Sequence, residues 1–509
     1  MKMEFKERPN VLLIMTDQQR FDTLRCMGND LIETPCLDWL ASEGTLFTKA
    51  YTPAPSCVPA RASLITGKNP WKTGVLGMGG NQLEMGVNLG ETIPSALSKL
   101  NYLTVGIGKM HFYPQRSLNG FHQTILDESG RIKDPDFVSD YKEWFDRNKP
   151  AEVNIIDHGM DWNGWGARPY HLPEYLHATN WTVNEGIKFL KRRDPSKPFF
   201  LKLSFARPHS PYDPPEYYFN MYNEKELPQP VIGDWVEEPL QKVTSLDAWN
   251  RRLTPEELHR AKAGYYGSIT HIDTQIGRFL YALKREKQLD NTIIIFTSDH
   301  GDMLGDHDLL RKTYAFEGSS HIPMLIVLPK KMRNIVKAKK VDTPVTLQDI
   351  FPTILDILGE EIPKDLDGKS MFKLIKNEDI DREYVHGEHS TCYSELHEMQ
   401  YIVSGDYKYI WYPRREKNSE QLFNLKADPY EIKDLVEVKE YSEILDKMRG
   451  FMVKELEERG EEIVKDGKLI CQKAKPYMES PYYQKRLDSY GWDWTKYGNF
   501  KKGTLETIR

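Results

Sequence analysis

Short apolar runs alternate with longer amphipathic segments along the first two-thirds of the chain. Apolar runs of strand length occur at 11–15, 103–107, 199–205, 291–297 and 324–328. Between them, apolar residues recur with helical spacing at 92–100, 181–193, 255–285 and 347–358. Such alternation is typical of an α/β protein. It predicts a large mixed, mostly parallel sheet with helices on both faces.

The pattern changes after Gly359. Residues 381–430 contain aromatic, strand-like runs such as 407–412, and a charged helix is predicted at about 441–459. The last stretch, 476–509, is rich in Tyr, Trp and Lys and lacks clear periodicity. We therefore predict two units. They are a main α/β domain over 1–375 and a smaller C-terminal α+β domain over 376–509, whose tail wraps over the surface.

Polar, ionisable residues follow several predicted strands directly. In chain order these are Asp17 and Gln18, then Lys109 and His111, then His209, and finally Asp299 and His300. Lys109 and His111 are two residues apart, and in the extended segment expected there their side chains project to the same side. In an open α/β sheet, ligands bind at the edge where the carboxyl ends of the strands meet. One such pair could simply cap a strand, but the repeated placement favours a shared site.

Cys57 stands just before a short predicted helix. Pro59 suits the first turn of that helix, and Gly67 can end it. Cys57 would then face free N–H groups and the positive end of the helix dipole, with Arg61 one turn further along. This environment stabilises an anion at residue 57, whereas composition alone favours a buried structural cysteine.

Composition restricts the classes of partner. The chain has 509 residues, 39% hydrophobic and 28% charged, with a formal net charge of -6. This balance predicts no nucleic-acid or membrane partner, so an anionic substrate would need a local cationic pocket. Residues 1–10 are charged, and the apolar run that follows is too short for a signal or a membrane span. The five cysteines are odd in number and contain no CxxC pair, which favours reduced thiols in the cytoplasm.

Cys57, Pro59 and Arg61 match the pattern Cys-x-Pro-x-Arg, and in this the chain resembles the sulfatase family. These are formylglycine-dependent enzymes of the alkaline phosphatase superfamily. Further matching stretches, at 108–111, 311–323, 349–355 and 421–431, extend the resemblance from Asn10 to about Leu435. The resemblance implies that residues 1–375 form the catalytic domain. It also implies that a formylglycine-generating maturation enzyme oxidises Cys57, whose hydrated aldehyde then attacks a sulfate monoester.

The resemblance also implies roles for individual residues. The catalytic set would be Cys57, Arg61, Lys109, His111, His209 and Lys312. The metal ligands would be Asp17, Gln18, Cys57, Asp299 and His300. In the family, the first lysine contacts sulfate, the first histidine is the base that expels it, and the second histidine and second lysine lie near the leaving oxygen. Arg311 leaves the assignment of Lys312 uncertain by one residue.

Two positions depart from the commonest family pattern. Many members have Asp-Asp and Asp-Asn where this chain has Asp17-Gln18 and Asp299-His300. The exchange lowers the ligand charge and introduces an imidazole. We expect one divalent cation, Ca²⁺ first, with Mn²⁺ and Mg²⁺ as alternatives.

The substrate predicted from the resemblance is a small sulfate ester, either a sulfated saccharide fragment or an aryl or alkyl sulfate. Candidate rim residues are Arg116, Trp162, Trp165, Tyr170 and His171. Their aromatic rings suit sugar or aryl stacking, and equally ordinary packing. A homo-oligomer is compatible with the sequence.

Two other functions compete with this prediction. The first is a phosphonate monoester or phosphodiester hydrolase of the same superfamily. Such enzymes share the metal pairs but tend to lack the Lys-x-His pair, so Lys109 and His111 favour sulfate. The second is a non-catalytic protein that binds sulfated glycans and keeps Cys57 unmodified.

Overall fold

The computed structural model describes residues 8–78, 89–131, 136–237, 248–471, 480–483 and 485. Its centre is an eight-stranded sheet in the order β10-β2-β9-β7-β1-β6-β4-β5. The strands are β1 (Asn10–Asp17), β2 (Thr45–Phe47), β4 (Leu103–Gly108), β5 (Gln123–Leu126), β6 (Phe199–Pro208), β7 (Thr292–Ser298), β9 (Met324–Val327) and β10 (Lys340–Val341). β1 pairs in parallel with β6 and β7, and β4 with β5 and β6, whereas β9 is antiparallel to β7 and β2. The predicted mixed, mostly parallel sheet is confirmed.

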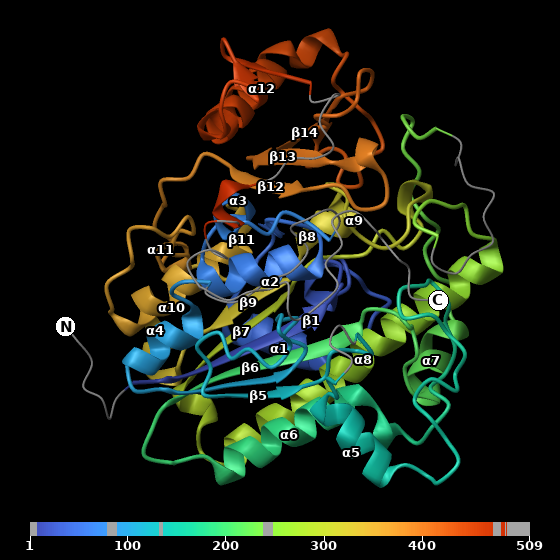
Figure 1. Cartoon of the computed structure of the whole chain (residues 1–509), viewed down its shortest axis with the longest axis vertical. Coiled ribbons are helices and arrows are strands. Elements are labelled where there is room, and N and C mark those ends of the chain that lie inside the picture. Colours follow the sequence, from blue (N-terminus) through green and yellow to red (C-terminus); the bar gives the residue numbers. More distant parts are fainter. Residues whose placement is uncertain are drawn as a thin grey trace.

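Helices cover both faces of this sheet (Figure 1). The face towards Leu12 and Ile14 carries α1 (Pro35–Glu43), α6 (Ala178–Arg192) and α8 (Pro255–Arg285). The face towards Val11 and Leu13 carries α2 (Cys57–Thr66), α4 (Ile93–Lys99) and α10 (Ile350–Leu358). Successive residues of a strand point to opposite faces. The continuous apolar run of β1 therefore supplies both cores at once.

A second, antiparallel sheet stands above the first. Its strands are β12 (Val385–His389), β13 (Met399–Ser404), β14 (Tyr407–Trp411) and β15 (Glu420–Asn424), in that order. One face packs against α12 (Ser442–Leu456), which lies on the side away from the main sheet (Figure 1). The other face packs on aromatic residues of the main unit, including Tyr51 and Phe316. This is the smaller α+β unit expected from the sequence, and the boundary at 375/376 stays a prediction.

Smaller elements complete the fold. A three-stranded sheet joins β11 (Val345–Thr346), β3 (Ala50–Tyr51) and β8 (His321–Ile322), and β16 (Val464–Lys465) pairs with β17 (Lys468–Leu469). The remaining α-helices are α3 (Pro70–Thr73), α5 (Asp140–Asn148), α7 (Glu216–Asn223), α9 (Glu317–Ser320) and α11 (Phe372–Ile375). Most of the tail at 476–509 lies outside the described residues, although Ser480 donates a hydrogen bond to the Trp71 carbonyl. In the described part of the chain, no helix combines the length and apolarity that crossing a bilayer requires.

Candidate active site

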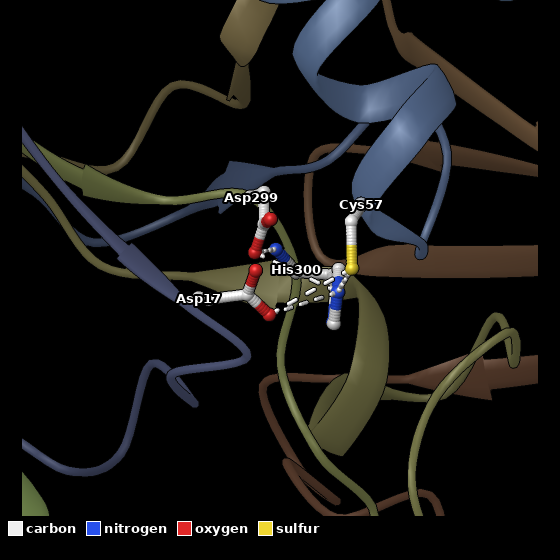
Figure 2. Close-up of side chains that lie close together, drawn as sticks. All are labelled: Asp17, Cys57, Asp299 and His300. Atoms are coloured by element: carbon white, nitrogen blue, oxygen red, sulfur yellow. Dashed lines mark hydrogen bonds and ion pairs between the residues drawn. The ribbon is translucent and has the colours of Figure 1, made fainter. Parts of the chain in front are cut away.

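The carboxyl ends of β1 and β7 meet the amino end of α2, as predicted for this edge of the sheet. Asp17 is the last residue of β1, and Asp299 and His300 follow β7 directly. Figure 2 shows these side chains converging with Cys57. One ligand atom from each of the four lies within 4.8 Å of the others, and all four residues are buried. Because β1 and β7 are neighbours in the sheet, their ends bring together residues far apart in the sequence.

Cys57 is the first residue of α2 and so lies at the amino end of a helix, as the sequence predicts. Its Sγ lies 3.2 Å from Nε2 of His300, 3.3 Å from Nζ of Lys312 and 3.8 Å from Nζ of Lys109. Burial raises the pKa of the Cys57 thiol, as does Asp17, but Lys109, Lys312 and His300 outweigh both and lower that pKa to about 6. The surroundings therefore stabilise negative charge at residue 57.

Two cations hold the acidic ligands in place. Arg61 donates from Nε to Asp299 Oδ2 at 2.8 Å and from Nη2 to Asp17 Oδ2 at 3.1 Å. Nζ of Lys109 lies 2.5 Å from Asp17 Oδ2. Burial would raise the pKa of Asp17, but these cations, Lys109 foremost, keep that pKa well below its usual value. Asp17 is therefore ionised, with Oδ1 directed at Cys57 Sγ across 3.7 Å.

The donor set fits a divalent cation. Nδ1 of His300 lies 2.8 Å from the Gly301 carbonyl and donates to it, so Nε2 keeps its lone pair for the cluster. This Nε2 is 3.6 Å from Asp299 Oδ1 and 3.9 Å from Asp17 Oδ1. Burial lowers the pKa of His300, but Asp299 and Cys57 raise it above its usual value. The cluster thus favours positive charge, as a metal site of carboxylate and imidazole ligands should.

Gln18, the other predicted ligand, borders this cluster with its amide. Its Oε1 accepts a hydrogen bond from Lys312 at 3.0 Å, and its Nε2 donates to Asp302 Oδ2 at 2.5 Å. Its backbone φ is 71°, a conformation that turns the chain sharply after β1. The sequence analysis missed Asp302, which orients the Gln18 amide. The role of Gln18 as a metal ligand stays a prediction.

Lys312 and Arg131 form a second cationic centre around His209. Nζ of Lys312 lies 2.7 Å from Nε2 of His209, and Nη2 of Arg131 lies 3.0 Å from the same nitrogen. Nδ1 of His209 lies 3.0 Å from the Ser210 carbonyl. Burial, with Lys312 and Arg131, lowers the pKa of His209 well below its usual value. The ring is therefore neutral, with its proton on Nδ1 and its Nε2 accepting.

The segment after β4 differs from the extended chain that the sequence predicts. Gly108 has a φ of 90° and His111 a φ of 61°, so the backbone bends between them. Lys109 reaches the cluster around Cys57, while the N–H of His111 donates to Glu128 Oε1 at 3.0 Å. Glu128 carried no signal in the sequence, because it acts through backbone N–H groups that any residue possesses. The predicted role of His111 stays a prediction.

Of the five predicted rim residues, the structure brings two to one cavity. A cavity of about 390 Å³ is lined by Trp162 and Tyr170, together with Glu128 and Arg131. The other three have different partners, which are Asp140 for Arg116, Arg251 for Trp165 and the Asn154 carbonyl for His171. Sequence composition could not separate these cases, because aromatic residues also serve ordinary packing.

Comparison with known proteins identifies the family. The Sulfatase family model matches residues 9–360, and the model of the C-terminal region of N-sulphoglucosamine sulphohydrolase matches residues 305–458. An arylsulfatase of Clostridium perfringens is 45% identical over 478 residues, covering 91% of this chain and 97% of that protein. A choline-sulfatase of Rhizobium meliloti is 30% identical, covering 84% of this chain and 83% of that protein. The chain belongs to the sulfatase family and is accordingly a sulfuric ester hydrolase.

Solved structures share the fold. The phosphonate monoester hydrolase of Agrobacterium radiobacter superposes with a TM-score of 0.72 at 25% identity, covering 89% of this chain and 95% of that one. A protein in complex with its substrate D-glucosamine-2-N,6-O-disulfate superposes with a TM-score of 0.70 at 24% identity, covering 88% and 98%. Both likenesses place the chain in the alkaline phosphatase superfamily fold.

Proposed function

We propose that this sulfatase acts on small sulfate monoesters through formylglycine, which a maturation enzyme makes from Cys57. The observation that carries the proposal is the position of Cys57, at the amino end of α2 with the cations of Lys109 and Lys312 within 3.8 Å of its Sγ. When formylglycine is present, its hydrate supplies one hydroxyl to attack sulfur and a second through which sulfate is expelled.

The cations around residue 57 would bind the sulfate group. Lys109 follows β4 and Lys312 lies in the loop before α9, so they can contact a bound sulfate from different sides. Arg61 is committed to Asp17 and Asp299, and thus orients the acidic ligands. Fixed positive groups in a buried site stabilise charge that develops on the sulfate oxygens without reorganising during the reaction.

Lys312 is the proton donor that the geometry favours for the leaving oxygen. Its Nζ is held by Gln18 Oε1 and His209 Nε2. Burial lowers the pKa of Lys312 despite the opposing effects of Cys57 and Asp17, and a lowered pKa makes the ammonium a stronger acid. His209 accepts a hydrogen bond from Lys312 through Nε2, so we propose that His209 orients the Lys312 ammonium. We assign His111 the removal of the proton from the second hydroxyl.

The residues that would hold a divalent cation are Asp17, Gln18, Asp299, His300 and residue 57. We propose Ca²⁺, with Mn²⁺ and Mg²⁺ as alternatives. The cation would polarise the hydroxyl of residue 57 and add charge to the anion site. Elemental analysis of the purified protein identifies the metal. Chelation should lower the melting temperature, because a ligand at 100 times its Kd stabilises a protein by about 2.7 kcal/mol.

The decisive experiment combines mass spectrometry with an assay. The protein is produced with and without a formylglycine-generating enzyme, the peptide containing Cys57 is weighed, and hydrolysis of 4-nitrophenyl sulfate is measured. We expect turnover only where the aldehyde is found. Cys57→Ser, left unmatured, should lose at least about a thousandfold in kcat. Near-normal activity of that variant would refute the mechanism, and an unmodified Cys57 from the native host would support a glycan-binding protein.

A phosphonate monoester or phosphodiester hydrolase is the second candidate. The similarity to the Agrobacterium radiobacter hydrolase and the presence of Gln18 and His300 in place of the commoner residues favour it. The matured enzyme should be assayed on aryl sulfate and phenyl phosphonate esters in parallel. A higher kcat/KM for the phosphonate ester would reverse our assignment.

A cytoplasmic location is part of the proposal and is supported by the five cysteines, all described and none in a disulfide.

A further inference from the structure

A cavity lies one strand beyond the anion site, at the same edge of the sheet. β5 pairs in parallel with β4 up to Leu126, so Asp127 and Glu128 emerge beside the segment that carries Lys109. Both acidic residues line the cavity of about 390 Å³. The order of the strands therefore sets this cavity next to the site around Cys57.

Two contacts connect the cavity to the catalytic residues. Arg131 lines the cavity and donates to Nε2 of His209 at 3.0 Å. Glu128 also lines it and accepts the N–H of His111 at 3.0 Å. His209 in turn contacts Lys312, the proposed donor to the leaving oxygen. A group attached to that oxygen would consequently extend past His209 towards the cavity.

The walls of this cavity are largely apolar. The apolar surface includes the side chains of Phe137, Tyr141, Ile155, Ile156, Trp162 and Tyr170. Aromatic walls bind flat or ring-shaped ligands well. The volume is near the lower end of the range for small-molecule pockets, about 300–1,000 Å³. It therefore admits a compact ring.

Four residues of these walls have a buried polar atom without a hydrogen-bond partner among the described residues: Asp127, Arg131, His158 and His177. Asp127 is 2% exposed, and its Oδ1 accepts from the Ser129 N–H at 2.9 Å, while its Oδ2 has no hydrogen-bond partner among the described residues. His158 is also 2% exposed, and its Nδ1 accepts from the Met160 N–H at 2.9 Å. Its proton is therefore on Nε2, which likewise has no partner there. Leaving such buried groups unpaired is costly.

The presence of a carboxylate acceptor together with N–H donors restricts the ligand. A hydroxyl can donate to Asp127 and accept from His158, so a ring with several hydroxyls satisfies both groups. A quaternary ammonium can do neither, and a plain aryl ring offers no donor. Arg207 also lines the cavity, but its guanidinium is paired with Asp213 through Nε at 2.7 Å and Nη2 at 3.1 Å. Arg207 is therefore committed to Asp213, whereas Nη1 of Arg131 has no hydrogen-bond partner among the described residues.

We propose that this cavity, the ring pocket, binds the leaving group of the substrate as a single polyhydroxylated ring, with hydroxyls hydrogen-bonded to Asp127 and His158. The substrate class is then a sulfated monosaccharide. This inference rests on the proposed sulfatase mechanism, because it takes the ring pocket as the continuation of the site around Cys57.

The test compares two substrates on matured enzyme. Asp127→Asn keeps the shape of the side chain, and His158→Asn keeps an acceptor near Nδ1 while removing Nε2–H. We expect each variant to lose about tenfold to a hundredfold in kcat/KM on the preferred member of a panel of sulfated monosaccharides. The same variants should change by less than about threefold on 4-nitrophenyl sulfate. Asp146→Asn is the matched control, because Asp146 also lines the pocket but is exposed and paired with Lys142.

The outcomes separate the two proposals. Equal losses on both substrates, or melting temperatures that fall with activity, would show a structural role for Asp127 and overturn the ring pocket. Hydrolysis of aryl sulfate without any activity on the panel would also overturn it, while the sulfatase mechanism stands. Failure on both substrates, with formylglycine verified by mass spectrometry, would refute the mechanism itself and the ring pocket with it.

Discussion

At the scale of single residues, the chemistry depends on how neighbouring charges change each group. Cys57 is buried, and burial opposes a thiolate. Lys109, Lys312 and His300 nevertheless lower its pKa. The same neighbours would stabilise the bound sulfate after maturation. The environment of an unmodified Cys57 therefore reports on the anion site without requiring turnover.

Unmatured, metal-free protein offers a direct measurement of this environment. Alkylation of Cys57 by iodoacetamide should rise with pH about a midpoint near 6, because its pKa is lowered to about 6 and the thiolate forms above that pH. Peptide mass spectrometry follows the rate site by site. Cys26 is the control, since burial and Asp38 raise its pKa to about 12. A midpoint at or above the ordinary thiol value, about 8.5, would contradict the electrostatic description.

Lys312 can be tested through the leaving group. Lys312→Met should lower kcat/KM by about 10²- to 10⁴-fold for alkyl or saccharide sulfates, whose leaving oxygens require a proton. The loss should be smaller for 4-nitrophenyl sulfate, because that phenolate leaves without protonation. Arg311→Met is the neighbouring control, since Arg311 packs over the Tyr393 ring. A larger loss in the Arg311 variant would move the assignment by one residue.

At the scale of elements, the ends of the strands position the site, and their backbone conformation matters as much as their side chains. Gly108 ends β4 with a φ of 90°, and a Cβ there would lie 1.9 Å from the Ser204 carbonyl oxygen of β6. That same carbonyl accepts the N–H of Lys109. The close approach of β4 and β6 therefore fixes the backbone position from which the Lys109 side chain extends.

Gly108→Ala should accordingly destabilise the protein by more than about 2 kcal/mol, because backbone strain adds to a steric clash. Urea unfolding measures the change in free energy. Gly405→Ala separates the two causes, since Gly405 has a φ of 57° but open space around it. We expect that control to cost about 1 kcal/mol. Equal losses in both variants would rule out the clash.

At the scale of the whole molecule, a buried charge cluster joins the antiparallel sheet to α9 and the segment before it. Lys408 of β14 lies 2.5 Å from Glu317 Oε1 and 3.0 Å from Glu431 Oε1, and it donates to the Ala315 carbonyl at 2.9 Å. The pKa of Glu317 is lowered, since Lys408 and His321 outweigh burial. Glu317 begins α9, a few residues beyond Lys312. The smaller unit therefore supports the loop that carries Lys312.

Lys408→Met should lower the free energy of unfolding by about 3–5 kcal/mol, because it leaves buried carboxylates without their cation. Activity should fall with it, since the support of Lys312 is weakened. Chemical denaturation and kinetics on matured protein measure both effects. Lys426→Met is the control, because Lys426 is exposed and its ion pair with Asp406 is long, at 3.9 Å. A change below about 1 kcal/mol in Lys408→Met would show that apolar packing alone joins the antiparallel sheet to that segment.

The sequence predicted much of this organisation where local patterns carry the information. The run at 11–15 marks β1 because a strand buried on both faces is continuously apolar. Pro59 marks the first turn of α2 and Gly67 its end, because both act on backbone conformation within a few residues. His111 is the counterexample. Its positive φ leaves no mark in composition, so the predicted extended segment was wrong there.

The sequence by itself determined the α/β architecture, the position of Cys57 at a helix start and the polar strand ends around it. Each follows from periodicity or from short-range backbone preferences. The tertiary structure decided the contact of Arg131 with His209 and the hydrogen bond from the His111 N–H to Glu128. It also decided which aromatic residues line the ring pocket. Arg131 and His209 are 78 positions apart. Such contacts depend on the order of strands in the sheet, which no local pattern encodes.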